Sequence, residues 1–146
     1  MHITRYTDYS LRVLMYVALC SGRKVNIQEI AEHYAISKNH LMKVVQSLNV
    51  QGYLETTRGK NGGIRLKRSA EEINLGELIR ETENDLALVE CLGQSNRCVI
   101  APVCQLKNVF SQAMESFFQV LHQYSLADLL PESSRSDLQQ ILKIQA

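Results

Sequence analysis

The sequence predicts a mainly α-helical fold with a small β-wing: a winged helix-turn-helix domain followed by a long C-terminal helix. Three observations predict this class. Residues 7–48 carry three successive apolar patterns of helical period, with a tight turn between the second and the third. A hairpin pattern with a glycine-rich turn follows over residues 53–66. Residues 106–124 then carry an apolar seam with heptad spacing.

The first helix is predicted over residues 7–21. Its apolar residues recur at steps of three and four, which is the period of one helix face. Thr7 or Asp8 is placed to cap the start of the helix, and Gly22 is placed to end it. The face that we expect to be buried consists of Leu11, Leu14, Met15, Ala18 and Leu19.

Two further helices complete the helix-turn-helix pattern. A short helix is indicated over residues 27–34, and Ser37 offers an N-cap for a third helix whose apolar face is Leu41, Val44, Val45 and Leu48. In this motif the start of the last helix enters the major groove of DNA. The candidate contacts, whose polar groups can bond to phosphates or base edges, are Ser37, Lys38, Asn39, His40 and Lys43.

The hairpin pattern predicts the wing. Residues 53–57 and 64–66 suit two strands, and the turn between them, R-G-K-N-G-G, contains three glycines that permit positive φ. A basic hairpin tip directly after a helix-turn-helix can reach a minor groove, where narrow A/T-rich tracts attract arginine. The candidate wing contacts are Arg58, Lys60 and Asn61.

The second half of the chain predicts a helix over residues 73–82, an irregular segment over 84–104, and a long helix after it. The heptad seam of the long helix is expected to pair with its copy in a second subunit, the alternative being packing against its own domain. The seam consists of Leu106, Phe110, Ala113, Phe117, Val120 and Tyr124. We therefore expect a DNA-binding domain, a cysteine-rich loop, and a dimerisation helix with its tail, at residues 1–82, 83–104 and 105–146.

The charge is distributed unevenly along the chain. Residues 1–69 contain eleven Lys and Arg against four acids, a net charge of +7, whereas residues 70–146 carry −6. A basic half suits a polyanionic partner such as double-stranded DNA. No apolar run approaches the roughly 20 residues that span a bilayer, and the N-terminus lacks the pattern of a signal peptide. A cytoplasmic protein without a membrane partner is therefore expected.

Three of the four cysteines form a cluster in the sequence. Cys91, Cys98 and Cys104 are spaced C-x6-C-x5-C within the irregular segment, whereas Cys20 lies alone on the first helix, as a small buried residue. Thiolates are soft ligands for iron–sulfur clusters, zinc or copper(I), and the spacing is wider than structural zinc sites prefer. An iron–sulfur cluster, a zinc site and a thiol redox switch all stay open on chemistry alone, and three thiolates leave one ligand position unfilled.

Several motifs of the sequence resemble those of one known family. The opening TRYTDYSLRVLMYVAL, the stretch SKNHLMKVVQSLNVQGYL, the wing RGKNGGIRL, the three-cysteine loop and the ending YSLADLL resemble the Rrf2 family of transcription regulators over nearly the whole chain. The chain is most similar to its nitric-oxide-sensing repressors. This resemblance implies a homodimer on an inverted-repeat operator and an iron–sulfur cluster, 4Fe–4S or alternatively 2Fe–2S. It also implies that nitric oxide nitrosylates the cluster and releases the DNA.

The resemblance also suggests the fourth ligand. Family members that regulate iron–sulfur biogenesis have a histidine three residues after the third cysteine, where this chain has Lys107. In the nitric-oxide sensors an aspartate near the N-terminus of the partner subunit can serve, and the matching residue is Asp8. The alternative for Asp8 is an acid that stabilises the first helical turn beside Arg12.

Other functions remain as alternatives to nitric-oxide sensing. An Rrf2-type regulator could sense iron–sulfur status or redox state, and a metal-free repressor could use the three cysteines as a disulfide switch. An iron–sulfur electron carrier or enzyme subunit would have no use for a basic half with a wing. The sequence contains no paired carboxylates in a pocket-like context, no phosphate-binding loop and no nucleophile with a plausible base, so an enzyme is not expected.

Overall fold

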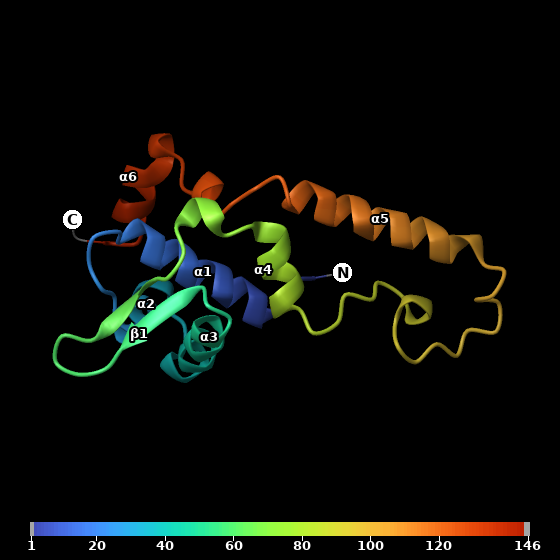
Figure 1. The fold of residues 1–146 in the computed structure, drawn as a ribbon, viewed down its shortest axis with the longest axis horizontal. Helices are drawn as coiled ribbons and strands as arrows, with labels where there is room; N and C mark the ends of the chain where they lie inside the picture. The colour runs from blue at the N-terminus through green and yellow to red at the C-terminus, as the bar shows by residue number, and fades with distance from the viewer. Residues whose placement is uncertain (1, 145–146) are drawn as a thin grey trace.

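The computed structural model describes residues 2–144. These residues form α-helices and one two-stranded sheet, which confirms the predicted mainly α-helical class with its small wing (Figure 1). No helix among them is both long and apolar enough to cross a membrane. The elements are α1 (Arg5–Leu19), α2 (Ile27–Tyr34), α3 (Lys38–Val50), β1 (Leu54–Thr57), β2 (Gly63–Leu66), α4 (Leu75–Thr82), α5 (Gln105–Leu121) and α6 (Glu132–Ile141).

A single apolar core surrounds α1, which contacts α3, β2 and α4. Of the five apolar residues predicted to be buried on this helix, Leu11 and Met15 are only partly buried, at the edge of the core. The predicted apolar face of α3 is buried in full. Burial of one such aliphatic side chain contributes about 1.5–3 kcal/mol. The core residues with no exposed surface include Val13, Leu14, Val25, Ile30, Leu41, Leu48, Leu54, Ile73, Leu78 and Leu126.

The start of α1 lies earlier than predicted. Thr4 is the N-cap, because its Oγ1 accepts a hydrogen bond from the backbone N–H of Thr7 at 3.3 Å, so the prediction of Thr7 or Asp8 as the cap was wrong. Thr7 is buried inside the helix and Asp8 lies in its first turn. Glu83 accepts a bond from the N–H of Thr4 at 2.8 Å. A partner 79 residues away thus stabilises the cap, and a local pattern cannot reveal it.

The wing is fastened to the rest of the domain. β1 and β2 pair antiparallel, with Leu54 opposite Leu66. Val25, just after α1, exchanges two backbone hydrogen bonds with Ile64 on β2, at 2.9 and 2.7 Å. The wing therefore has a third, short partner segment beside β2, which limits its movement relative to α1.

Two of the three turn glycines have the predicted positive φ: +101° at Gly59 and +156° at Gly63. Gly62 is required for a different reason. A Cβ atom at that position would lie 2.3 Å from the backbone oxygen of Thr57, so no side chain fits between the two strands of the turn.

The cysteine loop and α5 project from the winged domain as an arm. In Figure 1 the loop, residues 83–104, lies at one end of the long axis and the tip of the wing lies at the other. α5 ends at Leu121, so Tyr124 of the predicted seam lies beyond the helix. Among the residues of α5, Phe118 alone is buried within this chain. Pairing of the seam with a second subunit stays a prediction.

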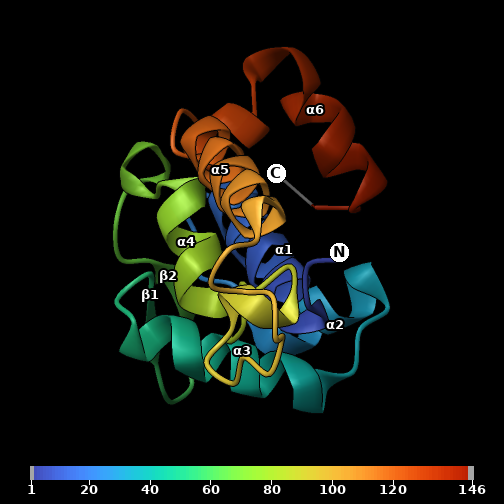
Figure 2. The ribbon, with the colours of Figure 1, turned by 90° about the vertical axis from the view of Figure 1, so that its right-hand side faces the viewer.

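The segment after α5 returns to the winged domain, and Figure 2 shows α6 to one side of α5. Arg135 donates from Nη2 to the backbone oxygen of Ala18 at 3.1 Å, and Gln139 donates to the oxygen of Leu19 at 3.2 Å. These carbonyls at the end of α1 have no partner inside the helix. The positive charge of Arg135 also interacts favourably with the C-terminal end of the helix dipole. Three residues of this segment join the core around α1, namely Leu126, Leu130 and Leu142. The division at residues 82 and 104 stays a prediction.

A partly buried polar network joins α1 to α2. The hydroxyl of Tyr16, which has no exposed surface, donates to Glu29 Oε1 at 2.9 Å and lies 2.8 Å from Nδ1 of His33. Arg23 also pairs with Glu29, and this hydrogen bond lowers the pKa of the carboxyl. Burial, together with the Glu29 carboxylate, raises the pKa of Tyr16. The first two helices are therefore tied by a charge-assisted bond as well as by apolar packing.

Replacement of Tyr16 by phenylalanine should lower the free energy of unfolding by about 1.5–3 kcal/mol, because a buried hydrogen bond to a charged group is lost. Urea denaturation at fixed protein concentration measures this change. The control is Tyr6→Phe, since the Tyr6 hydroxyl makes no hydrogen bond within residues 2–144. Equal stability of the two variants would contradict a stabilising role for the network.

Candidate functional site

The outward face of α3 carries the predicted major-groove residues. Its buried face fixes the orientation of the helix, which leaves Asn39 and Lys43 on the opposite side. Ser37 is the N-cap residue, but its side chain makes no capping bond, so the hydroxyl is available to another partner. All five predicted residues are exposed, and their contact with DNA stays a prediction: Ser37, Lys38, Asn39, His40 and Lys43.

Sequence reasoning missed one feature of this face. Met42 lies beside Lys43 and is 50% exposed, although it is a large apolar residue. Its place in the helical pattern, off the face formed by Leu41 and Val45, is the signal that could have revealed it. An exposed apolar side chain on such a helix can contact the methyl group of thymine.

The tip of the wing presents Arg58, Lys60 and Asn61 to solvent, and all three are exposed. Lys24 adds a fourth polar residue, since its Nζ donates to the backbone oxygen of Asn61 at 3.2 Å. This contact spans 37 residues, so no local pattern predicts it. On the strands behind the tip Arg65 forms an ion pair with Glu55 at 2.8 Å, so the unpaired charge lies toward the tip.

Asp8 lies in the first turn of α1 and pairs with Arg12. Arg12 Nε donates to Oδ1 at 3.1 Å and Nη2 lies 3.0 Å from Oδ2, a bidentate ion pair one helical turn long. Both side chains are 43% exposed. Within this chain the carboxylate therefore performs the role that its position in the helix implies, and it is accessible from outside.

The three loop cysteines are free of disulfide bonds. Cys91 lies in the short 3-10 turn Glu90–Leu92, Cys98 is exposed, and Cys104 is the N-cap residue of α5. Within residues 2–144 no three His, Cys, Asp or Glu side chains are close enough to hold a metal ion. Local hydrogen bonds shape the loop, for example where Cys98 N–H donates to Asn96 Oδ1 at 2.9 Å, and its turn Glu90–Leu92 contacts α5.

The donor set nevertheless suits a thiolate-bound cluster. None of the three thiols is in a disulfide, and each is at least partly accessible. Cys104 lies at the start of a helix of 17 residues, which fixes the position of this end of the loop. Lys107, one turn later, offers no ligand while it is protonated. The loop residues Val99, Ile100 and Val103 are exposed and apolar, which suits a segment that closes around a group or a partner.

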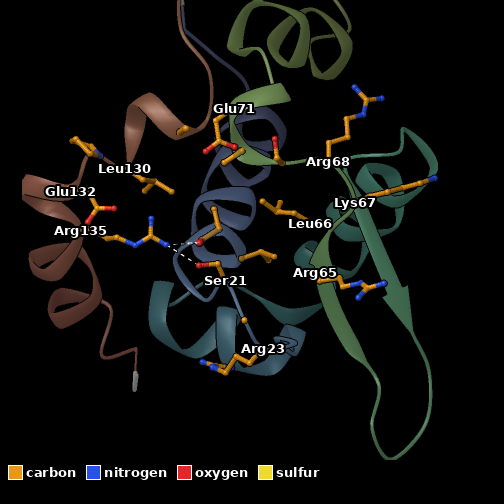
Figure 3. Close-up of a pocket in the computed structure, with 17 residues that line it drawn as sticks. Ser21, Arg23, Arg65, Leu66, Lys67, Arg68, Glu71, Leu130, Glu132 and Arg135 are labelled. Atoms are coloured by element: carbon orange, nitrogen blue, oxygen red, sulfur yellow. Dashed lines mark hydrogen bonds between the residues drawn. The ribbon is translucent and has the colours of Figure 1, made fainter.

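A cavity of about 730 Å³ lies apart from these residues, between the end of α1, β2 and α6 (Figure 3). Apolar side chains line much of it, including Leu66 and Leu130. The guanidinium of Arg135 points across it to Ser21 Oγ, at 3.1 Å, while Arg65, Lys67 and Arg68 point away (Figure 3). The cavity contains none of the predicted site residues.

Comparison with known proteins places these features in a family. Residues 3–132 match the Rrf2 family, described as iron-dependent transcriptional regulators. The HTH-type transcriptional regulator NsrR of Bacillus licheniformis is 52% identical over 132 residues, which cover 89% of this chain and 92% of that protein. NsrR of Bacillus subtilis is 49% identical over 146 residues, 99% of both.

Solved structures agree with this result. A putative transcriptional regulator from Listeria innocua superposes with a TM-score of 0.74 at 26% identity, covering 91% of this chain and 88% of that one. The family match spans both the helix-turn-helix and the cysteine loop. The chain therefore belongs to the Rrf2 family of transcription regulators, and it is a DNA-binding regulator and not an enzyme.

Proposed function

We propose that this chain is a homodimeric repressor that holds an iron–sulfur cluster and releases its operator when nitric oxide reaches that cluster. One observation carries the proposal: three free cysteines, each at least partly accessible, share a loop at the far end of an arm from a basic winged helix. Identity of 52% and 49% to regulators named NsrR supports the same function, as does the resemblance to nitric-oxide-sensing members of the family.

Dimerisation through α5 accounts for the exposed apolar residues along that helix. Leu106, Val109 and Val120 are 54–58% exposed although they are large aliphatic residues. Pairing with a second copy would bury them and present two α3 helices to an inverted repeat. Successive major grooves on one face of DNA are about 34 Å apart, so the two α3 helices of the dimer must be separated by the same distance.

The ligands that we assign to the cluster are Cys91, Cys98 and Cys104 of one subunit and Asp8 of the partner subunit. A bound cluster, 4Fe–4S or alternatively 2Fe–2S, would supply iron atoms that react with nitric oxide. A carboxylate is a weaker ligand for such iron than a thiolate, so Asp8 would be the weakest of the four ligands. Arg12 holds the Asp8 carboxylate in a bidentate ion pair in the absence of a cluster.

Two other kinds of sensor are compatible with the same loop. The cysteines could form a disulfide under oxidation, since they are free and at least partly accessible within one loop. A cluster could instead report iron status or oxygen. Both remain regulators of the same family, so DNA binding alone cannot distinguish them from a nitric-oxide sensor.

Titration of anaerobically purified protein with nitric oxide distinguishes these functions. Visible absorbance and affinity for a duplex selected by the protein are followed together. We expect a brown chromophore that bleaches in step with loss of DNA binding, at a few molecules of gas per cluster. A brown protein whose affinity for DNA does not change with nitric oxide would identify iron or oxygen as the signal. A colourless protein after anaerobic purification would favour a thiol switch or a zinc site.

Arg58→Ala should weaken operator binding by about 1–3 kcal/mol, because a wing-tip guanidinium contributes this much when it enters a minor groove. Fluorescence anisotropy of a labelled operator measures the change, and cluster absorbance should be unaltered. Lys143→Gln removes the same charge after α6 and serves as the control. Equal affinity of the two variants would remove Arg58 from the interface.

Cys98→Ala should give colourless protein with weak binding that no longer discriminates the operator from other duplexes. The reason is that loss of one thiolate leaves too few ligands for a cluster. Cys20→Ala is the matched control, since Cys20 is buried in the core and should leave the colour intact. A brown Cys98→Ala protein would contradict the ligand assignment.

A further inference from the structure

The base of α5 is joined to the start of α4 by a compact set of bonds. Asn74 donates from Nδ2 to the backbone oxygen of His122 at 2.9 Å, and its Oδ1 lies 2.8 Å from Nδ1 of the same histidine. Two backbone bonds flank this pair, from Leu75 N–H to Tyr124 O at 3.0 Å and from Leu126 N–H to Ile73 O at 2.8 Å. We call residues 73–76 with 122–126 the α4–α5 joint.

The side chain of Asn74 forms hydrogen bonds with both α4 and the end of α5. Its Oδ1 also accepts from the N–H groups of Gly76 and Glu77, at 2.9 and 3.2 Å, which caps the start of α4. Because Oδ1 acts as an acceptor throughout, Nδ1 of His122 carries the hydrogen and donates. Asn74 Oδ1 therefore caps the start of α4 and also bonds to His122 at the end of α5.

The two helices approach each other at backbone contact distance in the joint. A Cβ atom on Gly76 would lie 2.5 Å from Nδ1 of His122, so the imidazole ring rests directly on the α4 backbone. One turn earlier on α5, the ring of Phe118 is 2% exposed, and the guanidinium of Arg80 from α4 lies 3.7 Å from its centre. Close packing of this kind sets the angle between two helices and resists small changes of it.

The place of the joint in the fold gives this rigidity a role. Beyond α4 the chain runs out through the cysteine loop and returns along α5, so the arm meets the winged domain at α4 and at the joint (Figure 1). If two copies pair through α5, the distance between their α3 helices depends on the angle at which each α5 leaves its own winged domain.

We propose that Asn74 and His122 are positioning residues that set the spacing between the two α3 helices of the dimer. The proposal rests on the dimeric repressor function above. It assigns no contact with DNA or iron to either residue; both act through the direction of α5.

The test compares spacing preference in wild type and His122→Ala. The probes are the inverted repeat that wild-type protein selects from a random duplex pool, the same repeat with one or two base pairs added to or removed from its centre, and a duplex with a single half-site. We expect the variant to bind the selected repeat at least tenfold more weakly and to lose most of its preference for one spacing. Its half-site affinity and cluster absorbance should match wild type.

Three further variants make the outcome specific. His122→Asn places an amide donor near the position of Nδ1 and should restore the spacing preference. Gln123→Ala changes a neighbour that is exposed, as His122 is, but lies outside the bonds to Asn74, and it should behave as wild type. Gly76→Ala favours helix formation in α4 but meets the imidazole ring, so it should reduce the spacing preference without unfolding α4.

An unchanged spacing preference in both His122→Ala and Gly76→Ala would overturn the proposal. So would an equal loss of half-site and full-site affinity, since that result would indicate a general structural defect. The proposed function fails separately, if wild-type protein shows no response to nitric oxide while it still discriminates spacings.

Discussion

Burial of α1 is the constraint on which the rest of the structure depends. Its apolar residues occupy the centre of the core, and its two ends are held by segments from much later in the chain. Glu83 fixes the cap residue Thr4, while Arg135 and Gln139 cover the last carbonyls of the helix. α3 packs on this helix and β2 contacts it. The two elements that we propose to face DNA thus share one support, and a shift of α1 would move both.

Local features of the fold could be predicted from the sequence because they depend on short-range patterns. The apolar period of α3 determines which of its residues face inward, so the exposed positions of Lys38 and Lys43 follow from the pattern. Gly59 and Gly63 likewise indicate a tight turn, because few other residues accept its backbone angles. Three cysteines in fourteen residues limit the chemistry of a site to soft ligands, but within residues 2–144 no three potential ligands are close together, so the cluster stays a prediction.

Other features depend on distant parts of the chain, and no sequence period encodes them. Thr4 and Glu83 are 79 residues apart, so the contact that stabilises the early start of α1 is visible only in the folded structure. The same holds for the contact of Lys24 with Asn61 in the wing, which spans 37 residues. The bonds between Asn74 and His122 belong to the same class. The cysteine site is harder to predict from the sequence than these contacts. We assign its fourth ligand to another subunit, so a single chain would contain only part of the centre.

The return of α6 to the end of α1 also has a consequence for how the protein is made. Arg135 and Gln139 are added to the growing chain more than a hundred residues after the carbonyls that they cover. Until α6 has been synthesised, the Leu19 oxygen lacks its partner Gln139, the Ala18 oxygen is bonded only to the N–H of Ser21, and Leu130 and Leu142 are missing from the core. The core around α1, on which α3 and β2 pack, is therefore completed only when residue 142 has been added, later than the three loop cysteines.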